Sequence, residues 1–326
     1  MIITKTPFRI SFCGGGTDLP DFYKRYSGQV LSTTIDKYMY ILVKKQTGII
    51  EHKYKIHWNK TEFKNHISQI NHPIIKRTLQ YLKINYPIEI SSYSDIPAST
   101  GLGSSSAFTV GLVKALCALQ KKTMTKKKIS EIASKIEVDL IKRRIGRQDH
   151  YATCYGGLNH ITFFKDDSVK VRKVVISKKN KKKLENSLAL FYTNMKRNAD
   201  KVLSHQYKPN KDQTKHLLSM KENVYEFKKI LCKEKIEIKE IGKFLIRQWS
   251  LKKKINKISN KKIDKIYNKL ISLGIYGAKL LGAGKGGFLL LSSTKDVQKK
   301  IKYNLKLKNF IKVRFDNDGS KFVHRG

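Results

Sequence analysis

The amino-acid sequence predicts an α+β fold in two domains, and three observations support this prediction. The chain has 326 residues, roughly twice the length of an ordinary domain. Its first half alternates strand and helix patterns, whereas its second half is dominated by long helix patterns. The lysine-rich stretch 177–183 separates the two halves and has the composition of a linker. We therefore expect one α/β domain over residues 1–180 and a second over residues 181–326.

Strand patterns in the first half are short runs rich in β-branched and aromatic residues. The third of these runs, residues 84–94, ends in a turn at Asp95-Ile96-Pro97. Residues 158–176 indicate a hairpin that turns at Asp166-Asp167-Ser168. The three strand patterns lie at 8–13, 38–45 and 84–94.

Two helix patterns lie between the strands of the first half. Residues 107–119 are nearly all apolar, which predicts a buried helix. Thr125 can cap a second helix, in which apolar residues recur at helical spacing on one face as far as Leu140.

The second half combines strands at its two ends with helices between them. A strand pattern lies at 188–193, and an alternating pattern typical of a strand lies at 310–316. Helix patterns with apolar stripes occupy 212–233, 238–254 and 261–273.

The net charge raises the alternative of a nucleic-acid-binding protein. With 68 Lys and Arg against 25 Asp and Glu, the formal charge is +43. The lysines are spread along the chain, and the densest runs, 177–183 and 251–257, contain no aromatic residues for base stacking. We interpret the second run as a solvated helix end. Specific nucleic-acid binding is therefore not expected.

Cysteine usage and hydropathy favour a cytoplasmic protein. No apolar run approaches the length of a membrane span, and the N-terminus lacks the pattern of a signal peptide. The cysteines form no CxxC pair, so we expect buried, reduced thiols at Cys13, Cys117, Cys154 and Cys232.

The segment Pro97–Phe108, PASTGLGSSSAF, runs directly into the apolar helix pattern. Backbone N–H groups at a helix N-terminus attract anions, and glycines let a ligand approach them closely. The segment therefore predicts a phosphate-binding loop, although the lysine of a Walker motif is absent. The alternative is a simple glycine-serine turn in which Ser104 caps the helix.

Two further glycine segments favour the phosphate-loop interpretation. Residues 6–20 are a strand pattern that ends in three glycines and Thr-Asp, and residues 279–291 are a glycine loop that enters a strand. In order, the three segments resemble the signature motifs of the GHMP kinases. The middle motif of that family is matched by Pro97, Gly101, Leu102, Gly103, Ser104 and Ser105.

Within this superfamily the chain most resembles the D-glycero-D-manno-heptose 7-phosphate kinases. The similarity includes GGGTDLPDFY, IGRQDHYA, FYTNMKR and QWSLKKK and extends over almost the whole length. The resemblance implies an N-terminal α/β domain, a ferredoxin-like C-terminal domain and an active site between them. It also implies that Mg-ATP phosphorylates the anomeric hydroxyl of the heptose 7-phosphate, giving the 1,7-bisphosphate.

The resemblance assigns the catalytic and metal-binding roles. Asp149 in IGRQDHY is the expected general base, and Arg9 is expected beside it to stabilise developing negative charge. Ser105 and Glu137 are the expected Mg²⁺ ligands, with Asp139 as a weaker candidate. The alternatives are an exposed helical glutamate for Glu137, a turn aspartate for Asp149 and a solvent-facing arginine for Arg9.

Nucleotide and sugar are expected at the three glycine segments. Galactokinase has Glu-His where this chain has Gly15-Gly16, and the loss of a carboxylate suits an anionic sugar. Arg197, followed by Arg143 and Arg144, is the expected cation for the sugar's phosphate. Lys285, where the family has glycine, and His150 receive no role. The expected nucleotide residues are Pro97, Gly101, Leu102, Gly103, Ser104, Ser105, Ser106, Gly282 and Gly284, and the expected sugar residues are Gly14, Gly15, Gly16, Thr17, Asp18 and Arg197.

Two alternative functions remain open at this point. One is another anomeric sugar kinase, such as one for fucose, and the other is a non-catalytic protein that keeps the fold and binds nucleic acid. The complete set of Arg9, Asp18, Ser105, Glu137 and Asp149 argues against the second. A homodimer is compatible with the sequence.

Overall fold

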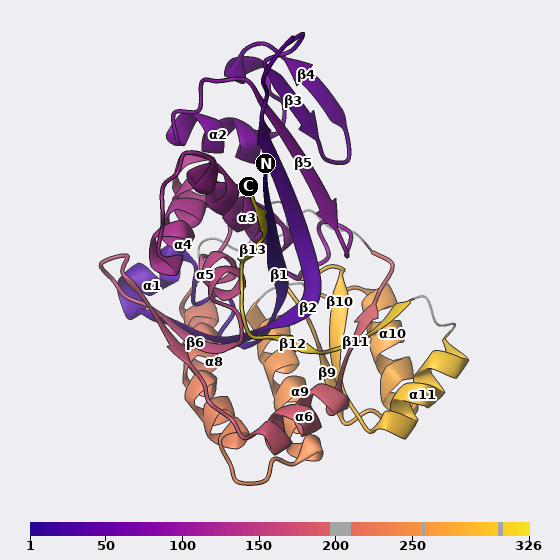
Figure 1. Ribbon diagram of the computed structural model, residues 1–326. Helices are drawn as coiled ribbons and strands as arrows, with labels where there is room; N and C mark the ends of the chain where they lie inside the picture. The colour runs from indigo at the N-terminus through magenta and orange to yellow at the C-terminus, as the bar shows by residue number, and fades with distance from the viewer. Residues whose placement is uncertain (196–209, 256–257, 306–308) are drawn as a thin grey trace.

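The chain folds around two β-sheets, each covered by helices (Figure 1). The structure is a computed structural model and describes residues 1–195, 210–255, 258–305 and 309–326. The first sheet has the strand order β13-β1-β2-β5-β3-β4, and β12 and the hairpin β6–β7 also pair within it. Its strands are β1 (Ile2–Cys13), β2 (Gly28–Lys45), β3 (Tyr54–His57), β4 (Thr61–Lys64), β5 (Ile88–Ser94), β6 (Leu158–Phe163), β7 (Val169–Lys173), β12 (Phe315–Asp316) and β13 (Lys321–Arg325).

The long apolar helix α3 (Ser104–Leu119) packs on β1 and β2 and against several helices of the first half. Most of α3 is buried, which explains why its sequence is apolar on nearly every face. The expected cap of the next helix is confirmed, because the Thr125 side chain accepts a hydrogen bond from the Lys128 N–H. These helices are α1 (Pro20–Tyr26), α2 (Pro73–Tyr81), α3 (Ser104–Leu119), α4 (Lys126–Ser134) and α5 (Gln148–Tyr155), with a short 3-10 turn η1 (Ile67–Gln69) and a π-helical turn η2 (Lys135–Leu140).

The second sheet is antiparallel, with the order β11-β8-β10-β9, and α9 packs against β9 and β10. The helix patterns expected in this half and the strand pattern at 188–193 are confirmed, within one or two residues at their ends. Its elements are α6 (Lys178–Ser187), β8 (Leu188–Tyr192), α8 (Lys211–Leu231), α9 (Ile238–Ile255), α10 (Lys261–Ser272), β9 (Gly277–Leu280), β10 (Phe288–Ser292), α11 (Lys295–Asn304) and β11 (Phe310–Lys312).

Three expectations were wrong. Residues 177–183 are not a linker, because Ser177 caps α6 and its Leu184 packs in the core. The strand expected at 310–316 divides into β11, which joins the second sheet, and β12, which joins the first. Cys232 is exposed, whereas the other cysteines are buried.

The C-terminal segment returns to the first sheet. In Figure 1 the strand β13 lies beside β1, and the Gly326 N–H bonds to the Met1 carbonyl at 3.2 Å. A single division at residue 180 would therefore separate strands that pair with each other. Within the described ranges, no helix is both long and apolar enough to span a membrane.

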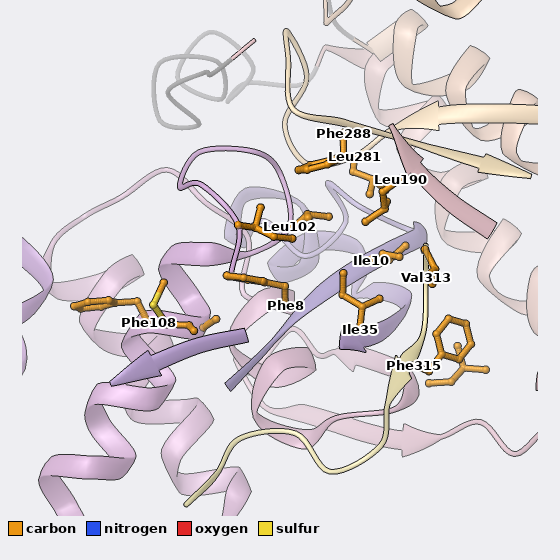
Figure 2. Close-up of a cluster of buried hydrophobic side chains, with 14 of the residues drawn as sticks. Phe8, Ile10, Ile35, Leu102, Phe108, Leu190, Leu281, Phe288, Val313 and Phe315 are labelled. Carbon is orange, nitrogen blue, oxygen red and sulfur yellow. The ribbon is translucent and has the colours of Figure 1, made fainter. Parts of the chain in front are cut away.

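One hydrophobic core joins the two halves and holds the glycine-serine loop between them. Figure 2 shows Phe8, Ile10 and Leu102 of the first half near Leu281 and Phe288 of the second, all in one cluster. The loop is also fixed by its backbone. The Arg9 N–H of β1 bonds to the Leu102 carbonyl, and the Phe288 N–H of β10 bonds to the Thr100 carbonyl. Both sheets therefore set the position of this loop.

Candidate active site

The three glycine segments meet at one cavity of about 860 Å³. Its wall includes Gly15, Gly101 and Gly282, one residue from each segment, although these residues lie far apart in the sequence. Helices α5, α8 and α9 contribute further lining residues. The three segments thus line one cavity, as is expected of an active site between the two halves.

The N-terminus of α3 opens onto this cavity. Gly101 and Gly103 have positive φ angles of 89° and 78°, which few residues other than glycine adopt. A Cβ on Gly103 would lie 3.3 Å from the Asp149 Oδ2 atom, so glycine also allows the loop to approach the acid. Ser104, Ser105 and Ser106 line the cavity beside the N–H groups of the first helical turn. This arrangement suits a phosphate chain.

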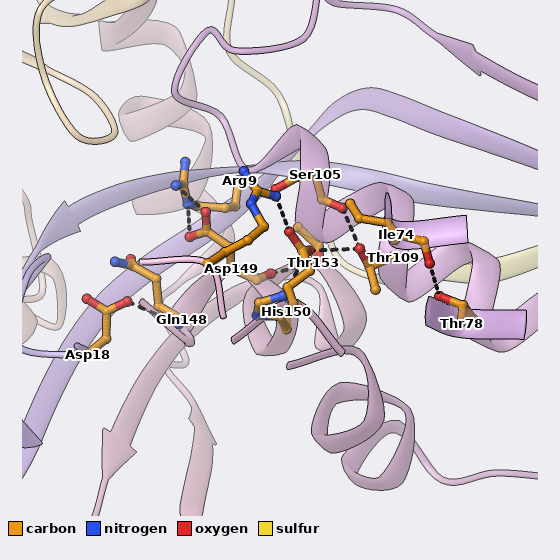
Figure 3. A network of polar contacts seen from close by, with 12 residues as sticks. Arg9, Asp18, Ile74, Thr78, Ser105, Thr109, Gln148, Asp149, His150 and Thr153 are labelled. Carbon is orange, nitrogen blue, oxygen red and sulfur yellow. Dashed lines mark hydrogen bonds and ion pairs between the residues drawn. The ribbon is translucent and has the colours of Figure 1, made fainter. Parts of the chain in front are cut away.

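Arg9 and Asp149 form a bidentate ion pair on the cavity wall (Figure 3). The Arg9 Nε and Nη2 atoms donate to the two carboxylate oxygens of Asp149, each at 2.6 Å. The third contact runs from Arg9 Nη1 to the Gly101 carbonyl at 2.7 Å. Arg9 is buried, and Asp149 keeps one-fifth of its side chain exposed on the cavity wall. Arg9 therefore ties the acid to the glycine-serine loop, and the solvent-facing alternative for Arg9 is wrong.

Asp18 lies on the same wall, held by backbone N–H groups. It accepts hydrogen bonds from Gly16 at 2.9 Å and from Gln148 at 3.2 Å. Burial raises the pKa of the Asp18 carboxyl, and the nearby charge of Asp149 raises it further. A Cβ on Gly146 would lie 1.8 Å from the Asp18 Oδ2 atom, so the glycine of IGRQDHY makes room for this carboxylate.

Glu137 lies away from the cavity wall in a buried cluster, in which both of its carboxylate oxygens have partners. Its Oε1 atom accepts hydrogen bonds from Thr109 at 2.8 Å and pairs with His150 Nε2 at 3.0 Å, and Oε2 accepts one from Arg143. Burial alone would raise the pKa of this carboxyl, but the bond and charge of His150 and the charge of Arg143 lower it to about 2. The alternative of an exposed glutamate is wrong, and His150 gains a structural contact that the sequence did not predict.

The fit of these residues to Mg²⁺ is partial. Ser105 lines the cavity, but Glu137 does not, and both of its oxygens already accept hydrogen bonds. Thr109 donates to both the Ser105 carbonyl and Glu137, so the carboxylate lies about one helical turn below the loop. Across the described ranges, no group of three or more acids, histidines or cysteines could hold a metal by itself. The site therefore fits an ion that the nucleotide phosphates help to bind.

Several expected residues lie away from the cavity wall. The Gly14, Thr17, Leu102 and Gly284 residues are packed rather than exposed to a ligand. Thr17, for example, donates to the Gly14 and Gln29 carbonyls. Asp139 is half-exposed and pairs with Arg147 at 2.9 Å, outside the cavity. Arg197 falls outside the described residues, and of Arg143 and Arg144 only Arg143 lines the cavity.

Lys285 has a φ of 60°, so a lysine occupies a left-handed position. Its side chain is exposed and is not on the cavity wall. Its backbone N–H bonds to the Ile258 carbonyl at 2.7 Å, which fixes the turn.

The sequence did not single out several lining residues. Lys279 begins the third glycine segment, and Gln148 precedes Asp149, so both stood within recognised motifs. Trp58, His72 and Phe108 form an aromatic end of the cavity, in which the His72 ring is stacked on Phe108 with centroids 4.9 Å apart. No local pattern marks these rings, because they come from segments that only packing brings together.

Known proteins resemble the chain over both halves. The model of the GHMP kinases N-terminal domain matches residues 73–157, and that of the GHMP kinases C-terminal domain matches residues 225–311. The D-glycero-alpha-D-manno-heptose 7-phosphate kinase of Campylobacter jejuni is 30% identical over 317 residues, which are 93% of this chain and 91% of that protein. The galactokinase of Thermotoga petrophila is 24% identical over 92% of each chain.

Solved structures agree on the fold. A D-glycero-D-manno-heptose 1-phosphate kinase from Bacteriodes thetaiotaomicron superposes with a TM-score of 0.80 at 22% identity and covers 99% of both chains. The mevalonate kinase of Methanococcus jannaschii superposes with a TM-score of 0.72 at 23% identity, covering 97% of this chain and 98% of that one. With the motifs gathered at one cavity and these similarities over both halves, the chain belongs to the GHMP kinases and is a sugar kinase of that family.

Proposed function

We propose that this kinase transfers a phosphoryl group from Mg-ATP to the anomeric hydroxyl of D-glycero-D-manno-heptose 7-phosphate. The product is the 1,7-bisphosphate, an intermediate for nucleotide-activated heptose. The observation that carries the proposal is the contact of Arg9 with both Asp149 and the Gly101 carbonyl, which puts an acid next to the phosphate loop. The heptose 7-phosphate kinase of Campylobacter jejuni supports the choice of sugar.

The nucleotide extends from the N-terminus of α3 to the aromatic end of the cavity. Its phosphates lie at the N-terminus of α3, where the N–H groups and the hydroxyls of Ser104, Ser105 and Ser106 can donate to them. The base lies against the aromatic end formed by Trp58, His72 and Phe108, which offers ring surfaces for stacking.

Asp149 accepts the proton of the attacking hydroxyl. The carboxylate is partly exposed on the cavity wall, and the Arg9 fork fixes its orientation. As the hydroxyl loses its proton to the carboxylate, Arg9 keeps a positive charge beside the reacting oxygen. Catalysis then rests mainly on positioning and on charge neutralisation, as is general for phosphoryl transfer.

Ser105 and Glu137 are the proposed protein ligands for Mg²⁺. When bound, the ion neutralises the charge of the transferring phosphate. Glu137 can reach the ion only if Arg143 leaves its Oε2 atom. Asp18, Gly15 and Gly16 bind the sugar from the other side of Asp149, where Asp18 accepts from sugar hydroxyls.

Location and assembly are part of the same proposal. We place the enzyme in the cytoplasm, where ATP is available, and a homodimer is compatible with it. The charge of +43 gives only weak, salt-sensitive binding to nucleic acids without sequence preference.

The test is an acceptor panel with Mg-ATP, in which ADP release is measured. The kcat/KM for heptose 7-phosphate should be at least about 100-fold higher than the kcat/KM for free heptose, because several charge-assisted contacts with the phosphate act together. Arg197→Ala should reduce this preference by slowing the phosphorylated sugar. Equal rates for the two sugars would make the protein a neutral-sugar kinase, such as one for fucose.

A heptose 1-phosphate belongs in the panel because the Bacteriodes thetaiotaomicron relative is named for it. Turnover of that sugar alone would show that the hydroxyl phosphorylated is not the anomeric one.

A further inference from the structure

One corner of the cavity is built from buried polar groups whose hydrogen-bonding capacity is only partly used. We call Ser11, Gly15, Gln148 and Lys279 the Ser11 corner, and all four line the cavity. The exposed fractions are 8% for Ser11, 8% for Gln148 and 4% for Lys279. Burial of polar groups is unfavourable unless they gain hydrogen bonds, so such a concentration needs an explanation.

Lys279 is a buried cation that donates hydrogen bonds to two backbone carbonyls. It lies on β9, and its Nζ atom donates to the Ser11 carbonyl at 3.0 Å and to the Phe12 carbonyl at 2.7 Å. An ammonium group has three N–H donors, so these bonds leave one. Within the described ranges, no carboxylate forms an ion pair with Lys279.

The charge state of this lysine follows from its surroundings. Burial lowers the pKa of Lys279 to about 8, and the Arg9 charge contributes in the same direction. Burial also raises the pKa of the Cys13 thiol to about 12, so the thiol brings no negative charge at neutral pH. Lys279 is therefore mostly charged near pH 7 and has no anion beside it within the described part of the chain.

Ser11 and Gln148 add groups without partners at the same place. The Ser11 Oγ and Gln148 Oε1 atoms are buried and accept or donate no hydrogen bond. A Cβ built on Gly15 would have Gln148 Nε2 at 3.7 Å and Ser11 Oγ at 3.8 Å as its nearest neighbours. The three residues therefore meet around a space that a side chain at position 15 would occupy.

Gly15 differs from the glycines on either side. Gly14 and Gly16 have positive φ angles of 81° and 100°, whereas Gly15 does not. Its backbone would accept alanine, and no contact of that Cβ would be tighter than ordinary van der Waals distance. What glycine provides here is empty space beside the Ser11 hydroxyl and the Gln148 amide.

We propose that the Ser11 corner binds the phosphate monoester of the acceptor sugar. Lys279 supplies the compensating charge, the Ser11 hydroxyl and the Gln148 amide N–H donate to phosphate oxygens, and Gln148 Oε1 accepts from a neighbouring sugar hydroxyl. Ser11 is two residues from Arg9 on β1, about 7 Å along the strand, a separation that one sugar ring can span. This inference rests on the proposed function, since it concerns the same acceptor.

The two arginines on the wall are already engaged with carboxylates, and Lys252, also on the wall, donates to the Leu280 and Gly282 carbonyls. Arg9 pairs with Asp149 and Arg143 with Glu137, so neither guanidinium lacks a counter-charge. Lys279 is distinguished from Lys252 by its deeper burial, and the carbonyls that Lys279 bonds neutralise no charge.

The experiment uses Gly15→Ala, Lys279→Met and a matched control, Lys114→Met. Lys114 is also a partly buried lysine that donates to a backbone carbonyl, that of Ser320, and it lies outside this cavity. With Mg-ATP, each corner variant should raise the KM for the sugar phosphate by about 10- to 100-fold, with kcat and the KM for ATP nearly unchanged. For Lys279→Met, the KM for the unphosphorylated sugar should change by less than about threefold. Lys114→Met should change neither the KM for the sugar phosphate nor the KM for ATP.

A second readout does not depend on turnover. Inorganic phosphate is added to enzyme saturated with a non-hydrolysable ATP analogue, so that the phosphate loop is filled. The wild type and Lys114→Met should gain thermal stability, and Gly15→Ala and Lys279→Met should not. If Lys279→Met fails to fold, Gly15→Ala carries the test, since its backbone is unstrained.

The outcomes separate the two proposals. If the wild type prefers the phosphorylated sugar and both corner variants keep that preference, the corner is wrong and the proposed function stands. If no sugar phosphate reacts but the phosphate-dependent stabilisation is lost in the corner variants, the corner stands and the proposed function fails. A phosphate effect that is equal in all four proteins would overturn the corner assignment.

Discussion

Two parts of the cavity wall differ in whether their buried polar and charged groups already have partners. Around Arg9, Asp149 and Glu137, every charged group has a partner at hydrogen-bond distance before any ligand binds. In the Ser11 corner, the buried Ser11 hydroxyl has no hydrogen-bond partner, and buried Lys279 bonds two backbone carbonyls but pairs with no carboxylate of the described ranges. The paired groups orient one another and form a preorganised frame, which is what catalysis needs. The unpaired groups gain their partners only from a ligand.

The largest expected effect comes from breaking the central pair. Asp149→Asn should lower kcat by about 10²- to 10⁴-fold, because the proposed base is lost, while the Kd for nucleotide stays nearly unchanged. Steady-state kinetics and nucleotide titration measure the two quantities. Asp139→Asn is the matched control, since Asp139 lies outside the cavity, and it should keep nearly full activity. An Asp149→Asn enzyme with more than about a tenth of the wild-type kcat would contradict the assignment.

Breaking the buried cluster should mainly affect stability. Glu137→Leu leaves His150 and Arg143 without their acceptor, and loss of one partner of a buried ion pair typically costs about 3–5 kcal/mol. Denaturant unfolding measures this loss. Glu131→Gln is the control, because its pair with Lys128 is a surface pair worth less than about 1 kcal/mol.

The same cluster should give a pH dependence of defined sign. The pKa of Glu137 is about 2 in the folded protein, below the ordinary 4.5. The folded state therefore prefers the charged carboxylate, so this stabilisation is complete above pH 4.5 and declines as the pH falls towards 2. The difference in unfolding free energy between the wild type and Glu137→Leu should shrink over that interval. A difference that stays constant from pH 6 to pH 2.5 would show that the carboxylate charge does not stabilise the fold.

The magnesium assignment is tested at the same residues. Glu137→Gln and Ser105→Ala should each raise the Mg²⁺ concentration needed for half-maximal rate at fixed ATP. An unchanged titration for Glu137→Gln would restrict this glutamate to holding Arg143, His150 and Thr109 in place.

A smaller effect is expected from Gly146, which lies next to Asp18 on the cavity wall. Gly146→Ala puts a Cβ 1.8 Å from the Asp18 Oδ2 atom, so Asp18 has to shift, at a cost of about 1–3 kcal/mol. The KM for the sugar should rise while the KM for ATP does not. If the sugar KM is unaffected, Asp18 does not bind the acceptor.

The smallest effect is expected from Lys285, which lies outside both parts of the cavity wall. Lys285→Gly should stabilise the protein by about 1 kcal/mol, because a lysine at a φ of 60° is strained and glycine is not. Thermal unfolding measures this gain. Both KM values should be unchanged, and a higher KM for ATP would show instead that the Lys285 ammonium contacts the nucleotide.

Local sequence patterns determined much of this protein. The glycines of the phosphate loop, the apolar run of α3, the cap at Thr125 and the hairpin turning at residues 166–168 depend on neighbouring residues, so each could be predicted directly. The resemblance to a known family added the pairing of Arg9 with Asp149, which lies 140 residues away in the sequence.

Tertiary structure alone decided the rest. Helical spacing placed Glu137 at the edge of an apolar face, but only the packing of α3 and α5 against its turn shows that it is fully buried and bonded to Thr109 and His150. Lys279 meets the Ser11 carbonyl from 268 residues away, and no local pattern encodes that contact. The same holds for β12 and β13, which extend the first sheet from the far end of the chain. Local periodicity reports which face of an element is apolar, whereas the partner of that face depends on how distant segments pack together.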